Sequence, residues 1–453
     1  MSPEPGGAES IAQLFDVVRR NPSHFGALVR LGTLLAESGN EAAARTVYAQ
    51  AVQEHPGVAG PYVCLGTLLV DAGEHAEALR LFEAALVLDP QNREAQRGLA
   101  VIHEREGDIG TAERVWRHAF PGGSFETSAY RGGDAPIRVL YLTSAVGGNI
   151  PMQHVFDPRL FEVTTLIAES SPPDVVLPPH DVVFNAIGDA DRCERALAAA
   201  SRVAASTVAP VANDPVRVRR TTRLSNAERL AALPDVVTAR MAEFRRHDLA
   251  APGGVALLEA EGFGWPLLLR SPGYQTGEHF VRVDGPSELS PGVADLPGAV
   301  VLAIEYVDSR SAGGAFRKYR VMTIGGRLYP MHLAIAPEWK VHYFRSAMAE
   351  RSDHREEEAA FLADMPGALG ARAVAALERV AALLGLDYGG IDFALRPDGR
   401  VLVFEANATM VIVPPDADER WDYRRDAIGR ALEAARAALI SRARATTRFR
   451  GRV

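Results

Sequence analysis

Lysine is nearly absent from this sequence. Of the 49 basic residues only two are lysines, Lys318 and Lys340. A codon bias toward arginine would account for the shortage as a whole. Under such a bias, a lysine that remains is more apt to be needed for its compact ammonium group, so both are candidate functional residues. The alternative, that both are ordinary surface residues, stays open.

Cysteines, long apolar runs and excess positive charge are lacking as well. Cys64 and Cys193 are too few for a disulfide framework and have no metal-ligand spacing. No apolar run approaches the roughly 18 residues that span a membrane, and the first residues have neither region of a signal peptide. The net charge of -8 argues against general nucleic-acid binding. We expect a cytoplasmic protein without membrane or nucleic-acid partners.

What the chain does have is room for several domains, and its N-terminal part repeats. It contains 453 residues, enough for two to four domains. Prolines and glycines recur every 34 residues, at Pro22, Pro56 and Pro90 and at Gly39, Gly73 and Gly107. The same spacing relates small and large residues, which are Ala44, Tyr48 and Ala51, then Ala78, Phe82 and Ala85, then Ala112, Trp116 and Ala119. The small residues let paired helices approach, and the large ones fill the space between them.

This pattern resembles the tetratricopeptide repeat over about residues 10–120, with three full repeats behind a lone helix, Ile11–Arg20. The resemblance implies an all-α superhelix whose concave groove comes from the first helix of each repeat. The implied groove residues are Gly26, Val29, Thr33, Gly60, Val63, Thr67, Glu94, Arg97 and Val101. The expected occupant is a peptide or protein partner or a second copy of the chain as a homodimer, with the protein's own second half as the alternative.

A glycine-rich connector at residues 121–136 separates this array from a different pattern. Beyond it, short apolar segments (Arg138–Leu142, Glu162–Ile167 and Asp181–Asn185) alternate with helical ones, which predicts a parallel sheet. Ligands of such sheets bind beyond the carboxyl ends of the strands. Gly148, Asn149 and Asn185 lie at those ends, where they either touch a substrate or serve the turns.

Two apolar segments near the C-terminus, Tyr388–Leu395 and Arg400–Asn407, flank a Pro-Asp-Gly turn and predict a hairpin. A loop of two or four residues would place Asp392 opposite Glu405, with Asn407 on the same face. A loop of three residues with a glycine bulge would put the two carboxylates on opposite faces. In the first register, two carboxylates and an amide oxygen converge, which suits Mg²⁺.

Ile391-Asp392 followed by Phe404-Glu405-Ala406-Asn407 resembles the magnesium signature of the ATP-grasp superfamily, and within it the glutathione-synthetase and ribosomal-protein glutamate-ligase type. The likeness runs over about residues 138–440. It implies a multi-domain fold: a tetratricopeptide superhelix (1–120), a linker (121–136), an α/β pre-ATP-grasp domain (137–215) and an α+β ATP-grasp domain (216–445). It also implies ATP with Mg²⁺, or Mn²⁺ in its place, and the metal ligands Asp392, Glu405 and Asn407.

Two phosphate-binding motifs follow in the order that the resemblance requires. Gly264–Arg270 is similar to the strand that presents a phosphate-binding lysine, a position held here by Arg270. The next segment, Ser271–Gly277, resembles the flexible loop that closes over the phosphates, which implies phosphate contacts near Gly273 and Gly277. Glycine frees backbone N–H groups for such a task.

The adenine and phosphoryl-transfer motifs come next. Val301–Val307 looks like the hinge strand that reads the adenine edge, implying contacts from Glu305 and Val307, with Asp308 reaching the ribose. Lys318–Gly326 is similar to the strand whose arginine, here Arg320, contacts the transferred phosphate. Lys318 is included among the nucleotide-contacting residues. The basic residues Arg217, Arg219, Arg220 and Arg223 precede these motifs as in the family, or form a solvated helix face.

Two departures leave the strength of the nucleotide site open. Many family members have a second lysine near the adenine, and Asn226–Arg229 contains none. Where relatives often carry an acidic residue two positions before the arginine, this chain has Lys318.

A further cluster, Met331–Tyr343, places His332, Trp339, Lys340 and His342 in a short span. Lys340 or His342 is expected to orient the acceptor carboxylate or the incoming amine. The alternative is an ordinary half-buried strand.

Together these features predict an ADP-forming, ATP-dependent carboxylate–amine ligase. A carboxylate becomes an acyl phosphate that a small amine or amino acid attacks, with Arg270, Arg320, Lys340 and His342 as the catalytic candidates. The repeat groove is expected to recruit a peptide or protein substrate. The alternatives are a phosphotransferase on the same fold and a non-catalytic repeat scaffold with a degenerate nucleotide site.

Overall fold

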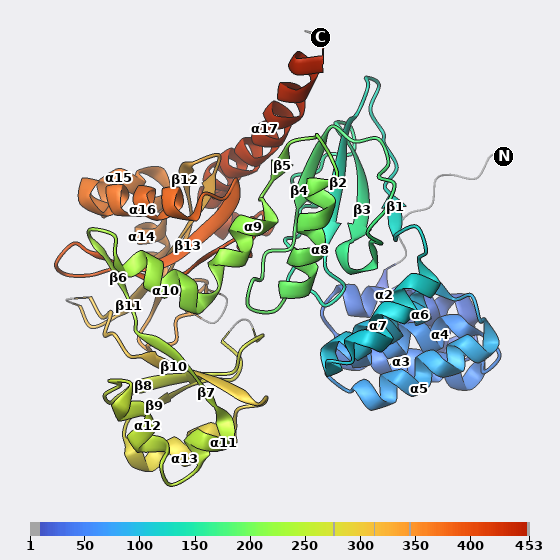
Figure 1. The fold of residues 1–453 in the computed structure, drawn as a ribbon, viewed down its shortest axis with the longest axis horizontal. Coiled ribbons are helices and arrows are strands. Elements are labelled where there is room, and N and C mark those ends of the chain that lie inside the picture. The colour runs from blue at the N-terminus through green and yellow to red at the C-terminus, as the bar shows by residue number, and fades with distance from the viewer. Residues whose placement is uncertain (1–9, 275–276, 312, 344–345, 451–453) are drawn as a thin grey trace. The chain divides into compact units, whose positions relative to one another are not determined.

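The computed structural model describes residues 10–274, 277–311, 313–343 and 346–450. The chain divides into two compact units, Met1–Ser124 and Phe125–Val453, called here the helical unit and the α/β unit (Figure 1). Within the described ranges, no helix is long and apolar enough to cross a membrane.

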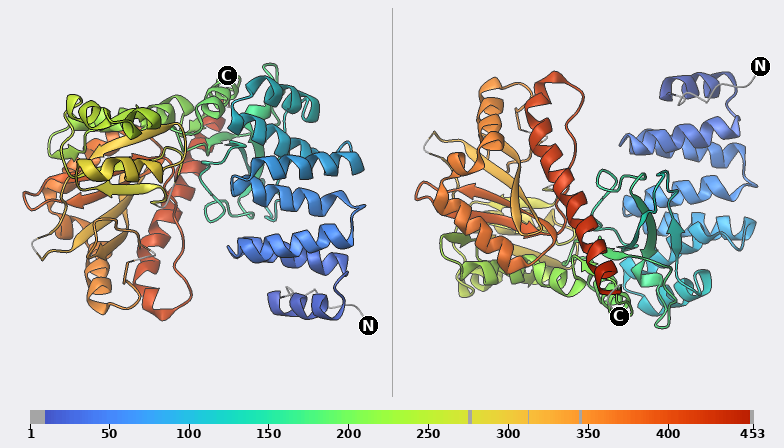
Figure 2. Two further views of the ribbon diagram at one scale, coloured as in Figure 1. Left: turned by 90° about the horizontal axis from the view of Figure 1, so that it is seen from below. Right: turned by 90° about the horizontal axis from the view of Figure 1, so that it is seen from above.

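The helical unit is a stack of helical hairpins. Its first helix, α1 (Ile11–Arg20), stands alone. Three hairpins follow, formed by α2 (Phe25–Glu37) with α3 (Glu41–Glu54), α4 (Ala59–Asp71) with α5 (His75–Leu88), and α6 (Arg93–Glu106) with α7 (Ile109–Ala119) (Figure 2). Each hairpin turns on a glycine with positive φ, at Gly39 (78°), Gly73 (80°) and Gly107 (80°). Residues other than glycine rarely adopt a positive φ, which explains why a glycine recurs at each of these turns, every 34 residues.

Two aromatic rings of the array, those of Tyr48 and Phe82, pack where a glycine leaves space. A Cβ atom added at Gly32 would lie 2.5 Å from the ring of Tyr48, and one added at Gly66 would lie 2.9 Å from that of Phe82. At Gly98 the added atom would lie 2.3 Å from the same Phe82 ring, which therefore touches two glycines. The repeating glycine and aromatic positions are thus one packing device, a ring seated directly on a helix backbone.

The α/β unit opens with a five-stranded sheet in the order β1-β3-β2-β4-β5. Strands β2 (Ile137–Thr143), β3 (Phe161–Ile167), β4 (Val182–Asn185) and β5 (Val211–Ala212) are parallel to their neighbours, and β1 (Phe125–Thr127) is antiparallel to β3. All four residues of β4 are buried, as expected for a central parallel strand. The parallel sheet expected from the apolar segments is therefore present.

Beyond α8 (Glu194–Ala205), α9 (Pro215–Val218) and α10 (Arg223–Ala231), a small antiparallel sheet follows in the order β7-β10-β8-β9. Its strands are β7 (Met241–Arg245), β8 (Leu267–Arg270), β9 (Phe280–Val283) and β10 (Val300–Glu305). Helices α11 (Arg246–Ala250), α12 (Gly254–Ala260) and α13 (Leu289–Ala294) lie beside it (Figure 1). Leu258, Leu267 and Val301 are fully buried in the core that joins these helices to the sheet.

A second five-stranded sheet carries the remaining strands in the order β12-β11-β13-β14-β6. They are β6 (Val236–Thr238), β11 (Phe316–Ile324), β12 (Arg327–Ala336), β13 (Tyr388–Leu395) and β14 (Val401–Asn407). The accompanying helices are α14 (Ser352–Ala363), α15 (Met365–Leu369), α16 (Ala371–Leu384), the 3₁₀ helix η5 (Glu419–Arg424) and α17 (Arg425–Arg450). On one face Tyr319 stacks on Phe393 and meets Phe361 of α14 edge-on, so this face packs against helices and the other is left for polar residues.

One hydrophobic core connects the parallel sheet to this second sheet, since Val139, Phe184, Val321 and Ile391 belong to the same buried cluster. The predicted order of a helical repeat region followed by α/β domains is confirmed, with one mostly parallel and two largely antiparallel sheets.

The contact between Gly98 and Phe82 yields a prediction for the helical unit. Gly98→Ala should lower the free energy of unfolding by about 1–3 kcal/mol, because the added methyl group overlaps the Phe82 ring. Gly110→Ala on α7 meets only the end of Arg114 and should change it by less than about 0.5 kcal/mol. Urea unfolding followed by helical circular dichroism measures both, and equal effects of the two variants would contradict the packing role.

Candidate nucleotide and metal site

The hairpin of β13 and β14 contains two irregularities that offset each other. Its turn is the three-residue glycine type, since Arg396 N donates to Arg400 O and Gly399 has a φ of 76°. That turn alone would put Asp392 and Glu405 on opposite faces. A bulge between Asp392 and Phe393 leaves Phe404 unpaired and shifts the register by one residue. Asp392 therefore lies directly opposite Glu405, and Gly390 lies opposite Asn407.

The register continues as a row of polar residues across four strands. Arg320 of β11 lies opposite Asp392, and His332 of β12 lies opposite Arg320. Opposed residues of paired strands share a face. His332, Arg320, Asp392 and Glu405 thus form a continuous row, called here the polar row, on the face away from Tyr319 and Phe361.

Asp392 is buried in the row and is held by two cations. Its Oδ1 accepts from Arg320 Nε at 2.6 Å, while its Oδ2 accepts from Arg320 Nη2 at 2.9 Å and from Lys318 Nζ at 3.0 Å. The Asp392 side chain is only 4% exposed. Burial by itself raises the pKa of this carboxyl group, but the charges of Arg320 and Lys318 lower it more, so the net pKa is well below its ordinary value.

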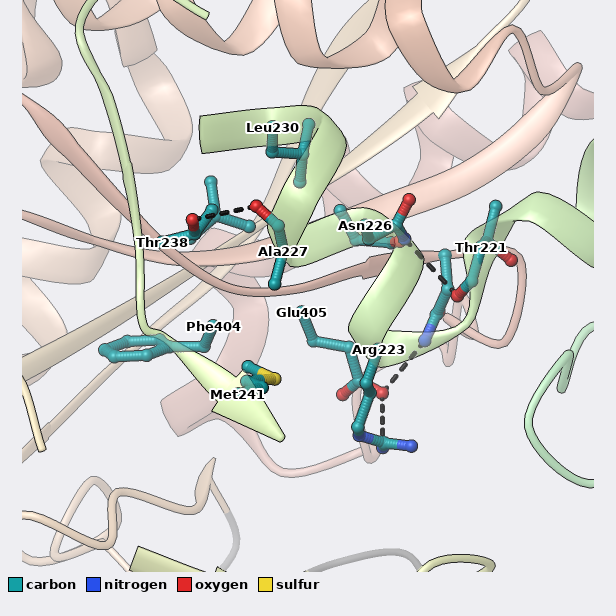
Figure 3. A pocket seen from close by; sticks show the side chains of 12 residues that line it. Thr221, Arg223, Asn226, Ala227, Leu230, Thr238, Met241, Phe404 and Glu405 are labelled. Carbon is teal, nitrogen blue, oxygen red and sulfur yellow. Dashed lines mark hydrogen bonds and ion pairs between the residues drawn. The ribbon is translucent and has the colours of Figure 1, made fainter. Parts of the chain in front are cut away.

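Glu405 is held by a different cation. Its Oε1 accepts from Arg223 Nη2 at 2.7 Å and from Asn407 Nδ2 at 2.9 Å. Arg223 also pairs with Asp191, at 3.0 Å between Nη1 and Oδ2, and thereby ties the segment after β4 to β14. Figure 3 shows Arg223 and Glu405 joined at one end of a hollow between α10, β7 and β14. The amide oxygen of Asn407 accepts from the N–H and hydroxyl groups of Thr409.

These contacts decide how a metal ion would fit. Among the described residues, no three histidine, cysteine or carboxylate side chains gather as metal ligands. Both oxygens of Asp392 are already used by cations, whereas Glu405 Oε2 accepts no hydrogen bond within the described ranges. The amide oxygen of Asn407 already accepts two hydrogen bonds from Thr409, and its NH2 group donates to Glu405. Of the three predicted metal ligands, Glu405 Oε2 is therefore the oxygen that is open to a divalent cation, which would take its other ligands from phosphate or water.

The predicted phosphate-binding residues lie on the small sheet. Arg270, at the end of β8, donates to the Tyr274 carbonyl and lies 5.5 Å from the centre of the Phe280 ring. Its Nε is buried without a hydrogen-bond partner in the described part of the chain. Burial, and then the charge of Arg223, lowers the pKa of Arg270 to about 10, so it remains a cation at neutral pH.

The glycine loop begins directly after Arg270. Gly273 and Gly277 have φ values of 84° and 76°, while residues 275 and 276 lie outside the described residues. A Cβ added at Gly277 would lie 2.8 Å from Lys340 Cε. Lys340 Nζ also donates to the Phe280 carbonyl at 3.0 Å, so the structure places this lysine against the loop. His342, two residues beyond, is half-buried.

The predicted hinge residues follow β10. The backbone N–H of Glu305 donates to Arg240 O at 2.9 Å, and its Oε2 accepts from Arg240 N at 3.1 Å. Val307 is half-buried, and Asp308 is exposed and paired with Arg310. The structure thus gathers Lys318, Arg320, Asp392, Glu405 and Asn407, while the hinge residues contact other neighbours.

Arg223 and His332 belong to the site but were not assigned to it from the sequence. For Arg223 the expectation of a solvated helix face is wrong, since its side chain is 13% exposed. His332 is 8% exposed, and its Nδ1 has no hydrogen-bond partner among the described residues. Burial, and then the charge of Arg320, lowers the pKa of His332 well below its usual value, so it is neutral. The sequence indicated His332 only as a member of the Met331–Tyr343 cluster, and the strand register is what relates it to Arg320.

A buried carboxylate supports the edge of the sheet next to His332. Glu358 of α14 accepts from Leu333 N at 3.2 Å, from the Tyr343 hydroxyl at 3.1 Å and from the Tyr423 hydroxyl at 2.5 Å. Tyr343 in turn packs on the His332 ring at 4.7 Å between centroids. These contacts fix the position of edge strand β12, because Leu333 N would otherwise be unpaired there.

The asparagines at the strand ends of the first sheet serve turns. Asn149 accepts from Ser144 N at 2.7 Å and donates to Ser144 O at 2.8 Å. Asn185 is fully buried and donates to the backbone carbonyls of Ile187 and Asn213. The sequence left open whether these asparagines contact a substrate or stabilise turns, and their hydrogen bonds show that both stabilise turns.

A comparison with known proteins identifies the kind of repeat in the helical unit. Residues 7–59 and 65–123 match the tetratricopeptide repeat family model, so the helical unit is a tetratricopeptide repeat array. No curated protein sequence matches the chain. A MamA crystal structure is 20% identical, with a TM-score of 0.24, over 25% of this chain and 67% of that one. MamA from Desulfovibrio magneticus RS-1 is 22% identical, with a TM-score of 0.23, over 24% of this chain and 63% of that one.

A third solved structure extends into the α/β unit. The VanG D-Ala:D-Ser ligase from Enterococcus faecalis is 13% identical, with a TM-score of 0.43, and the match covers 68% of this chain and all (100%) of that one.

The ion pairs of Asp392 predict a stability effect. Asp392→Asn should lower the free energy of unfolding by about 3–5 kcal/mol, because the partly buried cations Lys318 and Arg320 lose the charge of their buried partner. The folded-state pKa of Asp392 is depressed, so the contribution is complete above pH 4 and is lost as the pH falls further. Urea unfolding at several pH values should therefore show a constant difference from the wild type between pH 5 and 8.

Asp418→Asn provides the control, because it breaks an ion pair with Arg420 whose side chains are 39% and 51% exposed. Its cost should stay below about 1 kcal/mol. A similar loss of unfolding free energy in both variants would show that burial does not increase the contribution of the Asp392 ion pairs.

Proposed function

We propose that the protein is an ATP-dependent, ADP-forming carboxylate–amine ligase that acts through an acyl phosphate. The observation that carries the proposal is the polar row, in which Arg320, Asp392 and Glu405 lie side by side on one sheet face. A row that mixes partly buried cations and carboxylates suits a ligand that carries both phosphate groups and a divalent ion. The ordered motifs around the row support the same conclusion.

In this proposal the cations of the site bind and orient the phosphates. Arg270 has no carboxylate partner among the described residues and still has an unused N–H group, so it can bind an incoming phosphate without breaking an ion pair. Arg320 binds Asp392 in the polar row, where it can contact the phosphoryl group that is transferred. Phosphoryl transfer depends on positioning and on charge neutralisation more than on covalent help from the protein.

A magnesium ion held at Glu405 Oε2 would supply further charge neutralisation at the phosphates, and Asn407 could join it by exchanging a hydrogen bond from Thr409 for the metal. A carboxylate oxygen of the substrate attacks the γ-phosphorus and ADP leaves. The amine nitrogen then attacks the acyl carbon, loses a proton, and phosphate departs as the amide bond forms.

The loop residues are proposed to cover the phosphates. Lys340 contacts both the glycine loop at Gly277 and the strand that follows it at Phe280, so it can hold this loop in place. Glu305, Val307 and Asp308 remain proposed adenine and ribose contacts, and His342 a proposed acceptor contact.

Nucleotide binding provides the first test. Glu405→Gln should weaken Mg²⁺-dependent ATP binding about tenfold or more, because it removes the charge of the polar-row carboxylate whose Oε2 accepts no hydrogen bond from the described residues. Glu419→Gln, an exposed residue of η5, is the matched control and should bind normally. Isothermal titration with ATP, with and without Mg²⁺, gives both values, and unchanged binding by Glu405→Gln would refute the site.

A screen of ADP release against amino acids and peptides then tests the reaction. Release that requires both a carboxylate and an amine supports ligation. A stable phosphorylated product formed without an amine would show a phosphotransferase instead.

The repeat array is proposed to recruit a peptide or protein substrate through its concave groove. Val29 and Val63 occupy equivalent, half-buried positions on α2 and α4, next to the small residues Gly26 and Gly60. The full chain with Val29→Glu and Val63→Glu should capture fewer partners from cell extract than the wild type, because two charges enter the part of the groove that the first two repeats line with uncharged residues.

Val87→Glu is the matched control for the groove variants. Val87 lies on α5, a second helix of a repeat, and is 83% exposed. Capture that is reduced equally by all three changes, or by none, would remove the groove from the proposal.

A further inference from the structure

Two largely buried side chains near the β12 end of the polar row have nitrogen atoms without a hydrogen-bond partner in the described part of the chain. His332 is 8% exposed, and its Nδ1 is one of these atoms. The Arg424 side chain of η5 is 12% exposed, and its Nε is the other. Its ion pair with Glu358 spans 3.7 Å, which is longer than a hydrogen bond. Buried polar groups in this state cost free energy, which a ligand with oxygen acceptors would recover.

Both side chains lie against the same aromatic ring. The centroid of the His332 ring is 4.7 Å from that of Tyr343, and Arg424 Cζ is 4.7 Å from the centre of the Tyr343 ring. The Tyr343 hydroxyl donates to the buried carboxylate of Glu358 at 3.1 Å, which holds the ring in place. The fold thus brings an imidazole of β12 and a guanidinium of η5 together at one fixed position.

Charge is distributed unevenly along the polar row. At the β14 end one cation, Arg223, faces two carboxylates. Toward the β12 end two cations, Arg320 and Lys318, share the single carboxylate of Asp392. Positive charge is therefore in excess on the side of His332, and negative charge is in excess on the other side. Electrostatic attraction then favours a divalent cation at the β14 end and an anionic group at the β12 end.

An apolar wall adjoins the unsatisfied nitrogen atoms. Ala334 lies two residues beyond His332 on β12 and therefore shares its face of the sheet. Ala334 is buried in one cluster with Tyr343, and the half-buried side chains of Val341 and Trp421 pack against this cluster. The β12 end of the row thus combines hydrogen-bond donors and positive charge with an apolar surface, which suits a carboxylate on an apolar body.

We propose that the β12 end of the polar row binds the carboxylate substrate, and that this substrate is an apolar carboxylic acid. Its carboxylate accepts hydrogen bonds from Arg424 and from a ring N–H of His332, while its apolar part lies against Val341 and Trp421. Arg320, one strand away at about 5 Å, then holds the phosphoryl group beside the attacking oxygen. This inference rests on the proposed function, since it names the substrate class of the same site.

Binding of a matched pair of small molecules tests the inference. The full chain is titrated calorimetrically with N-acetyl-L-leucine, an apolar carboxylate, and with N-acetyl-L-leucinamide, its uncharged counterpart. Each titration is run with and without Mg²⁺ and the non-hydrolysable analogue AMP-PNP. The wild type should bind the carboxylate about tenfold or more tightly than the amide, because only the carboxylate balances the excess positive charge.

Two variants remove the proposed contacts one at a time. His332→Phe keeps a ring against Tyr343 but removes the N–H donor, and Arg424→Gln removes the charge. Each should weaken carboxylate binding about tenfold and leave binding of the amide and of AMP-PNP unchanged. Arg420→Gln, which changes a 51% exposed arginine of the same helix η5, is the matched control and should bind like the wild type.

The outcomes separate this inference from the proposed function. A wild type that does not prefer the carboxylate, or a His332→Phe variant that binds it normally, would overturn the substrate assignment, and normal AMP-PNP binding would leave the proposed function standing. Absence of AMP-PNP binding would overturn the proposed function and, with it, the role of the bound carboxylate as a substrate. If Arg424→Gln does not fold, because Glu358 loses a neighbouring charge, His332→Phe alone decides the test.

Discussion

The ion pairs of the buried Asp392 carboxylate set the arrangement of the candidate site. Two carboxylates that face each other across adjacent strands repel, so each needs a cation nearby. Here Arg320 and Lys318 compensate Asp392, while Arg223 compensates both Glu405 and Asp191. Three cations thus balance three carboxylates. Since Arg223 and Asp191 come from segments before the small sheet, this balance also joins the parallel sheet to the second five-stranded sheet.

Arg270 differs from these three cations. Among the described residues it forms no ion pair, its Nε is unsatisfied, and burial together with Arg223 lowers its pKa to about 10. A buried cation without a partner is costly, and an anionic ligand would remove that cost. Under the proposed function, the other cations of the site must exchange a carboxylate for a phosphate, whereas Arg270 has no carboxylate to give up. Phosphate binding would therefore begin at Arg270.

The helical unit could be predicted almost completely, whereas the hairpin of the site could not. In the repeats every determinant is local and recurs: a glycine that turns the chain and a ring that fills the space above another glycine. In the hairpin, the Gly399 turn is visible in the sequence and by itself gives the wrong register. The bulge at Phe404 restores the pairing of Asp392 with Glu405, and no glycine marks it. Such a bulge is stabilised by the side chains on either face, which depend on distant strands.

The same distinction explains which site residues the sequence could indicate. Asp392, Glu405, Asn407 and Arg320 lie in motifs whose order along the chain carries information. Arg223 looked like part of a solvated basic helix, because its partners Asp191 and Glu405 are 32 and 182 positions away. His332 lies at the far end of the polar row and owes its place to the bulge between Arg320 and Val321 of the β11–β12 pair. Without that irregularity, the residue opposite Arg320 would be Met331 and the row would end in an apolar side chain. The polar character of the site therefore depends on two strand irregularities, one on each side of Asp392.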